Sequence, residues 1–263
     1  ADRGADSPLS KPLTTAGTLA ALIVGVVTYL GGQYGWHDVP AALGVLFAFF
    51  ITSVGFSFAG RKRKELLVDV PKGGSRDAWQ VAANGGVATV SAALAAFISH
   101  DAQPGHVAYA LLFAFAGAYA AATADTWSTE IGSAFGGNPR SIVGFAPIAP
   151  GLSGGVTLLG TTAMFAGAAW VALVFALLAH RTDALGIVML AGIAGALADS
   201  ILGATLQRIE FCASCKRQTE MQTHACGTAT IHWRGVRWMT NDAVNALATL
   251  TRGLVSAGLF LAG

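Results

Sequence analysis

Seven long apolar stretches are the feature of this sequence that most restricts its fold. Each is roughly 18 to 25 residues long, the length that an α-helix needs to cross about 30 Å of hydrocarbon with its backbone groups paired. The chain is 54% hydrophobic and only 11% charged, which excludes a soluble globular protein. We therefore predict an all-α, polytopic transmembrane helical bundle of about seven spans, with residues 1–263 forming a single transmembrane domain. The predicted spans are residues 13–31, 39–60, 79–99, 106–130, 154–179, 184–206 and 240–262.

The distribution of Lys and Arg predicts the orientation in the membrane. Residues 31–38, between the first two spans, contain no Lys or Arg, whereas the next connection carries Arg61, Lys62, Arg63, Lys64, Lys72 and Arg76. Because cytoplasmic loops are enriched in basic residues, this second connection should be cytoplasmic. We therefore expect an integral protein of the inner (cytoplasmic) membrane, with a cytoplasmic N-terminus and a cytoplasmic active face. The same alternation leaves Arg181 in an outer loop and Arg252 within the last span.

Four carboxylates occur near the cytoplasmic ends of otherwise apolar spans: Asp125, Glu130, Asp199 and Asp242. A carboxylate within a membrane helix costs roughly 2.5 to 3.5 kcal/mol, so each needs a partner or a wet cavity. Asp125 and Asp199 follow Ala in a short internal echo, ADTW and ADSI. Mg²⁺ prefers carboxylate and amide oxygens, so these residues are candidate magnesium ligands with a catalytic role. The alternative is interhelical hydrogen bonding that only holds the bundle together.

Amide, hydroxyl and charged side chains at helical spacing accompany these carboxylates. Thr129 shares a helix face with Asp125, and Gln207 shares one with Asp199. The predicted topology brings all of them to one membrane depth, so we expect a single cytoplasmic vestibule. The other members are Arg76, Asp77, Gln80 and Asn84 around the third span, and Asn241 and Asn245 on the last.

Two Gly-containing segments are candidates for phosphate binding. The string GLSGGVT opens the predicted fifth span, and the backbone N–H groups of Ser153, Gly154 and Gly155 lie where a helix dipole favours anions. The string KGGSRD at 72–77 supplies Lys72 and Arg76 as cationic partners for phosphate.

The predicted cytoplasmic loop 207–239 contains all three cysteines of the chain. Cys212 and Cys215 form a CxxC pair, and His224 and Cys226 follow as an HxC pair. These four residues suit a tetrahedral structural Zn²⁺ site, although the HxC spacing is uncommon. Free thiols in a reducing compartment are the alternative.

Several strings along the chain also resemble a known family. They are RDAWQVAANGGVA (76–88), ADTWSTEIG (124–132), GLSGGVT (151–157), GALADSILGATLQ (195–207) and NDAVN (241–245), with the Cys/His loop between the last two. Together they resemble the integral-membrane family called domain of unknown function 92, which includes animal transmembrane protein 19 and the phytyl-phosphate kinase of plants and cyanobacteria. The string ADTWSTEIGSAFGG is also similar to the acidic motif of CTP-dependent dolichol and phytol kinases, with Ala124 in place of its Gly.

The resemblance implies transfer of a phosphoryl group from a nucleoside triphosphate, such as CTP, to an isoprenoid (phytyl or prenyl) monophosphate. Mg²⁺ would then be held by the four carboxylates, while Asn84, Asn241 and Asn245 would orient phosphates. The expected partners are the lipid phosphate, the nucleotide and the membrane, with no nucleic acid. A transporter or flippase of lipid phosphates, or a cytidylyltransferase-like lipid enzyme, remain alternatives. Crowding of ionisable residues on one side favours an enzyme, because transporter sites lie near the bilayer midplane.

Overall fold

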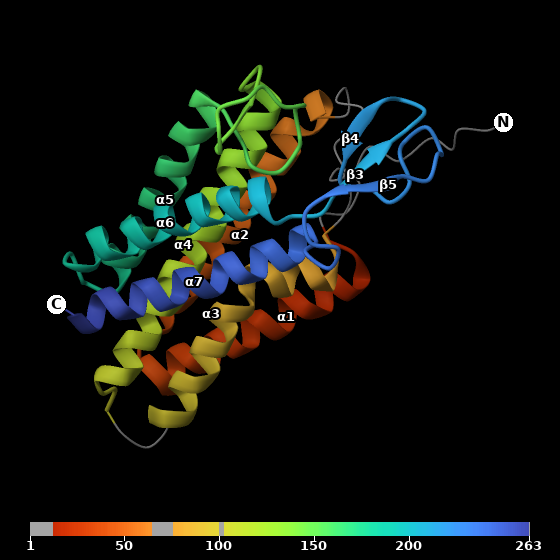
Figure 1. The fold of residues 1–263 in the computed structure, drawn as a ribbon. Helices are drawn as coiled ribbons and strands as arrows, with labels where there is room; N and C mark the ends of the chain where they lie inside the picture. The colour runs from red at the N-terminus through yellow and green to blue at the C-terminus, as the bar shows by residue number, and fades with distance from the viewer. Residues whose placement is uncertain (1–12, 65–75, 100–102, 263) are drawn as a thin grey trace.

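Seven membrane-length helices make up most of the computed structural model, which describes residues 13–64, 76–99 and 103–262 (Figure 1). All seven are long and apolar enough to cross a bilayer, so the predicted polytopic helical fold is confirmed. The helices are α1 (Thr15–Leu30), α2 (Val39–Lys64), α3 (Ala78–Ser99), α4 (His106–Phe135), α5 (Leu158–Leu178), α6 (Ala184–Thr205) and α7 (Asn241–Ala262).

Several helix boundaries differ from the prediction by a few residues, and two of these differences are accompanied by a specific hydrogen bond. The first span continues beyond α1 through a π-helical segment, η1 (Gly31–Trp36), and Trp36 Nε1 donates to the carbonyl of Ala108 at 2.9 Å. The fourth helix continues to Phe135. The fifth begins at Leu158 instead of residue 154, because Thr157 caps it by accepting a hydrogen bond from the Gly160 N–H at 3.0 Å.

Helix α4 is the centre of the bundle (Figure 1). Its most apolar segment is 83% buried, against 28–44% for the other spans. Small residues allow close approach of its neighbours: a Cβ at Gly117 would lie 2.5 Å from that of Ser256 on α7, and one at Gly192 on α6 would lie 3.0 Å from that of Ala120. This is the small-residue packing expected between membrane helices, where backbones approach closely.

Two small antiparallel sheets add to the predicted all-α architecture. Strands β1 (Arg140–Ser141) and β2 (Gly155–Val156) pair between α4 and α5. Strands β3 (Ile209–Cys212), β4 (Arg217–Thr219) and β5 (Ile231–Arg234) form a second sheet in the order β4-β3-β5. We call residues 209–234 the β-module. It lies beside the N-terminal end of α7, at the end of the bundle opposite the chain's C-terminus (Figure 1).

Candidate functional site

A pocket of about 220 Å³ lies where the β-module meets the helix ends. Its walls come from the first turn of α3, the segment after α6, the β-module and the start of α7. Four of the predicted site residues line it together: Gln80, Gln207, Asn241 and Asp242. Three residues without a predicted role complete it, namely Arg208, Glu220 and Thr240.

Gln207 is the most constrained residue of this pocket. Its side chain is only 1% exposed, yet neither its Oε1 nor its Nε2 has a hydrogen-bond partner among the described residues. The Nδ2 of Asn241 is also buried and lacks a partner there. An unsatisfied buried polar group costs about 1–3 kcal/mol, and each such group in a native structure needs an explanation. Both amides line a pocket, so a polar ligand or bound water can satisfy them.

Charged residues of both signs flank the two amides. Arg208 forms an ion pair with Glu210, with 3.2 Å between Nε and Oε1, and donates to the carbonyl of Arg237 at 3.2 Å. Thr240 supports the start of α7, because its Oγ1 accepts from the Ala243 N–H at 3.3 Å. The pocket therefore combines one cation, Arg208, and two carboxylates, Glu220 and Asp242, with several neutral hydrogen-bonding groups.

The turn expected to bind phosphate is occupied by a carboxylate of the protein itself. The backbone N–H and Oγ of Ser153 donate to Glu220 Oε1 at 2.9 and 2.6 Å. This turn precedes β2, so it is not the open N-terminus of α5 that the sequence suggested. Gly154 has a φ of +80° and packs on α6, where an added Cβ would lie 2.5 Å from that of Ala204. Gly155 is the first residue of β2.

Two of the four intramembrane carboxylates interact with a buried cation. Arg252 on α7 is 1% exposed, and its Nη2 lies 3.7 Å from Asp199 Oδ1. Its guanidinium also interacts electrostatically with Asp125 and donates to the Gly195 carbonyl at 3.4 Å. Arg252, which was placed within the last span without a predicted role, therefore provides the cationic partner of Asp199. The signal was present in the sequence, because an Arg within an apolar span needs a partner.

Glu130 belongs to a separate contact between α2 and α4. Ser57 Oγ donates to Glu130 Oε1 at 3.0 Å, and Arg76 Nη2 donates to Ser57 Oγ at 3.3 Å. Partial burial lowers the pKa of Arg76, and Glu130 opposes this shift. Arg76 precedes α3 and contacts Ser57 of α2, whereas Gln80 and Asn84 lie within α3.

The other predicted binding residues have local roles or lie apart. Asp77 caps α3, since its Oδ1 accepts from the Gln80 N–H at 2.9 Å. Asn84 Nδ2 donates to the Gln80 carbonyl at 2.9 Å. Thr129 is exposed, and Asn245 is half-buried on α7. Lys72 lies outside the described residues.

In the described part of the chain, the four carboxylates do not form one ligand group for a metal. They divide among Arg252, the Ser57–Arg76 contact and the pocket. The group of three or more Cys, His, Asp or Glu side chains that is close enough to share an ion is Cys212, Cys215, His224 and Cys226. Hydrogen bonds with Thr228 and His224 lower the pKa of Cys226 to about 6, and the hydrogen bond with Cys226 raises that of Cys215 to about 11.

Comparisons with known proteins agree with a membrane protein over nearly the whole chain. The family model described as "Integral membrane protein DUF92" matches residues 7–253. Protein PGR of Arabidopsis thaliana is 31% identical over 94% of this chain and 88% of its own length. Uncharacterized membrane proteins of Methanocaldococcus jannaschii and Synechocystis are 28% and 26% identical, over 95% of this chain and 87% and 83% of their lengths. No solved structure matches.

Proposed function

The chain belongs to the integral-membrane DUF92 family, and from this premise we propose that it is a membrane phosphotransferase. The donor is a nucleoside triphosphate, such as CTP, and the acceptor is an isoprenoid (phytyl or prenyl) monophosphate. The product is the isoprenoid diphosphate. Charge distribution in the loops supports a cytoplasmic site for this reaction, where nucleotides are available.

The observation that carries this proposal is the pocket at the end of the helical bundle. It offers one guanidinium, two carboxylates, the buried amide of Gln207 and the buried Nδ2 of Asn241, and these amide atoms lack partners in the described chain. An isoprenoid chain held in the leaflet would bring its phosphate to this depth, because α6 and α7 are membrane-length helices that end and begin at the pocket. Arg208 suits contact with phosphate, and Gln207 and Asn241 suit neutral donor and acceptor groups of the nucleotide or the phosphates.

The proposed reaction asks little of a general base. A phosphate monoester has its second pKa near 6, so at neutral pH it is already largely a dianion. Its oxygen attacks the γ-phosphorus of the triphosphate, the bond from the γ-phosphorus to the bridging oxygen breaks, and the nucleoside diphosphate leaves with that oxygen. The work of the protein is to align two anions that repel each other.

Fewer carboxylates are placed to bind Mg²⁺ at the pocket than the four that the sequence suggested. Asp199 pairs with Arg252, which also interacts electrostatically with Asp125, and Glu130 accepts a hydrogen bond from Ser57. Asp242 is then the intramembrane carboxylate that lines the pocket. Mg²⁺ commonly binds through one or two carboxylates together with waters and substrate phosphates, so Asp242 and Asn241 would be sufficient protein ligands. When bound there, it would neutralise phosphate charge.

The test is a direct assay on the purified full chain in detergent. The protein is offered several prenyl monophosphates, four nucleoside triphosphates and Mg²⁺, and mass spectrometry identifies the lipid and nucleotide products. We expect the prenyl diphosphate and a nucleoside diphosphate. Release of inorganic pyrophosphate with a nucleotide-linked lipid would indicate a cytidylyltransferase, and lipid-phosphate flipping in vesicles without nucleotide would indicate a transporter. Either result would replace the proposal.

Two variants link the activity to the pocket. Asp242→Asn and Gln207→Leu should each lower kcat/KM by at least about tenfold, because the first removes a charge and the second removes both polar atoms of a buried side chain that lines the pocket. Gln33→Leu is the control, since Gln33 is exposed in η1 at the other end of the first span. Full activity in both pocket variants would show that the reaction takes place elsewhere.

A further inference from the structure

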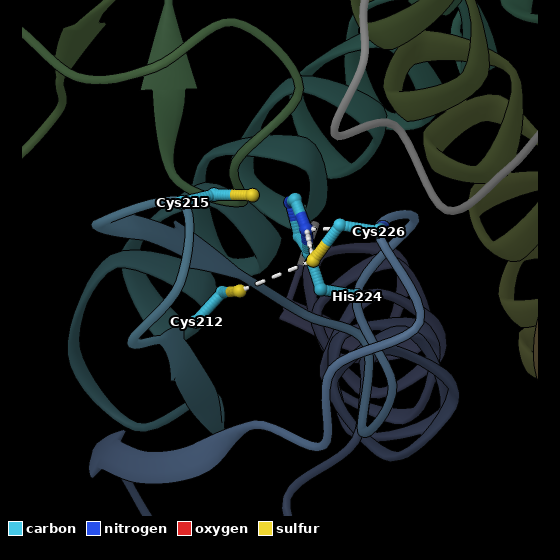
Figure 2. Close-up of side chains that lie close together, drawn as sticks. All are labelled: Cys212, Cys215, His224 and Cys226. Atoms are coloured by element: carbon cyan, nitrogen blue, oxygen red, sulfur yellow. Dashed lines mark hydrogen bonds between the residues drawn. The ribbon is translucent and has the colours of Figure 1, made fainter.

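We propose that Cys212, Cys215, His224 and Cys226 bind a structural Zn²⁺ ion that fixes the β-module beside the pocket. Figure 2 shows that the four side chains converge from two segments of the module. Metal binding here does not depend on the proposed reaction, because none of the four residues lines the pocket.

The distances between the ligand atoms suit one tetrahedral zinc ion. The Sγ atoms of Cys212 and Cys226 are 3.6 Å apart, and His224 Nδ1 lies 3.1 Å from Cys226 Sγ. All four ligand atoms lie within 4.8 Å of one another. With Zn–S bonds of about 2.3 Å and Zn–N bonds of about 2.0 Å, tetrahedral ligands are separated by roughly 3.5–3.8 Å. Movements of a few tenths of an ångström to about 1 Å would therefore complete the site.

The backbone explains how the uncommon HxC spacing can supply two ligands. The His224 N–H donates to the Thr228 carbonyl at 2.9 Å, and the Gly227 N–H donates to the His224 carbonyl at 2.8 Å. This tight turn brings the side chains of His224 and Cys226 to the same side. Both cysteine turns are followed by a residue with positive φ, Lys216 at 54° and Gly227 at 81°. Since a non-glycine residue rarely adopts this conformation, the Lys216 geometry indicates a turn held by its surroundings.

The β-module has too small a core to hold this geometry by packing. Ile209 and Cys212 are the hydrophobic side chains buried within it, whereas Ile231 and Trp233 are 58% and 54% exposed. Small units with so little buried apolar surface usually depend on a metal or a disulfide. A Cys212–Cys226 disulfide would leave Cys215 and His224 without a shared role, and the 3.6 Å between the two sulfurs is well above a bond of about 2.05 Å.

The zinc site is linked to the pocket through Glu220. This residue lies between β4 and the His224 turn, lines the pocket and accepts both hydrogen bonds from Ser153. Metal binding would therefore fix Glu220 and, with it, the contact between the β-module and the β1–β2 segment. Loss of the metal should loosen this wall of the pocket.

The test measures metal in the full chain, purified in detergent through a tag without His. Elemental analysis should give about one zinc per chain, and replacement by Co²⁺ should give the thiolate charge-transfer and intense visible bands of a tetrahedral sulfur-rich site. Cys212→Ser and Cys215→Ser should lower the zinc content by roughly tenfold or more. Ser214→Ala and His232→Ala are matched controls from the same module, because both residues are exposed and neither is in the ligand set, and they should keep the ion.

A further variant separates metal loss from misfolding. Cys226→His replaces one zinc ligand with another, so it should retain zinc while a Cys226→Ser protein loses it. Absence of zinc from the monodisperse wild-type protein, iron in its place, or an intact-mass loss of about two hydrogens that marks a disulfide would each overturn the proposal.

Discussion

Arg252 is the residue whose surroundings most change the interpretation of the intramembrane acids. It is buried on α7, next to Asp199 of α6 and within electrostatic reach of Asp125 of α4. A charge within the hydrocarbon region is tolerated when it is paired, so this group joins three helices and accounts for two costly carboxylates at once. The short sequence similarity between ADTW and ADSI thus has a structural counterpart, since the guanidinium of Arg252 pairs with Asp199 and interacts electrostatically with Asp125.

Removing that guanidinium should destabilise the bundle. We expect Arg252→Met to lower the free energy of unfolding by about 3–5 kcal/mol, because it leaves two partly buried carboxylates without their cation. Thermal unfolding in detergent measures the effect. Asp199→Asn in the Arg252→Met background should restore part of the loss. An additive double variant would show that the two residues do not interact.

For individual residues, the sequence predicted which polar side chains matter better than it predicted which residues contact each other. Gln207, Asn241 and Asp242 were predicted from polar side chains at span ends, and the structure brings them into one pocket with Gln80. Glu220 was missed because its contact with Ser153 joins residues 67 positions apart and depends on the fold of the β-module. No helical spacing links such residues, so sequence periodicity carries no information about the pair.

Some contacts between helices depend on glycines that leave room for a side chain of the neighbouring helix. Gly195 on α6 is the clearest case, because an added Cβ would overlap the aliphatic part of Arg252, with 2.5 Å to its Cδ. The contact sets the distance between α6 and α7 beside the ion pair.

Gly195→Ala should therefore lower stability, by about 1–3 kcal/mol from overpacking, and should weaken the Arg252–Asp199 pair. Gly186→Ala on the same helix is the control, since an added Cβ there meets nothing within 4 Å. Thermal unfolding of both variants in one detergent checks the difference. Equal melting temperatures would mean that α6 and α7 adjust freely at this contact.

The helices were predictable as elements because the bilayer imposes their length and composition. The ends of the helices were less predictable from the sequence, since the cap at Thr157 and the π-helical extension to Trp36 depend on individual hydrogen bonds. The strands have two to four residues, too few for an alternating pattern to stand out from loop sequence.

For the whole molecule, the unequal distribution of basic residues predicts one orientation. The β-module and the pocket should face the cytoplasm, and the end of α7 should face outward. Alkaline phosphatase fused after Gly263 should then be active, and green fluorescent protein at the same position should be dark. If the green fluorescent protein fusion were fluorescent and the phosphatase fusion inactive, the orientation would be the opposite one, with the pocket outside.

The central position of α4 has a consequence for how the protein is made. Its partners α5, α6 and α7 are translated later, so the surface around Gly117 that finally meets Ser256 must first face lipid or the insertion machinery. The many alanines of α4 are compatible with this early exposure to lipid, but the cation that interacts electrostatically with Asp125 is supplied by α7, which is translated after α4, α5 and α6. Insertion of α7 therefore supplies this charge partner, and a nascent chain that stops before Arg252 would hold Asp125 and Asp199 within the membrane without that cation.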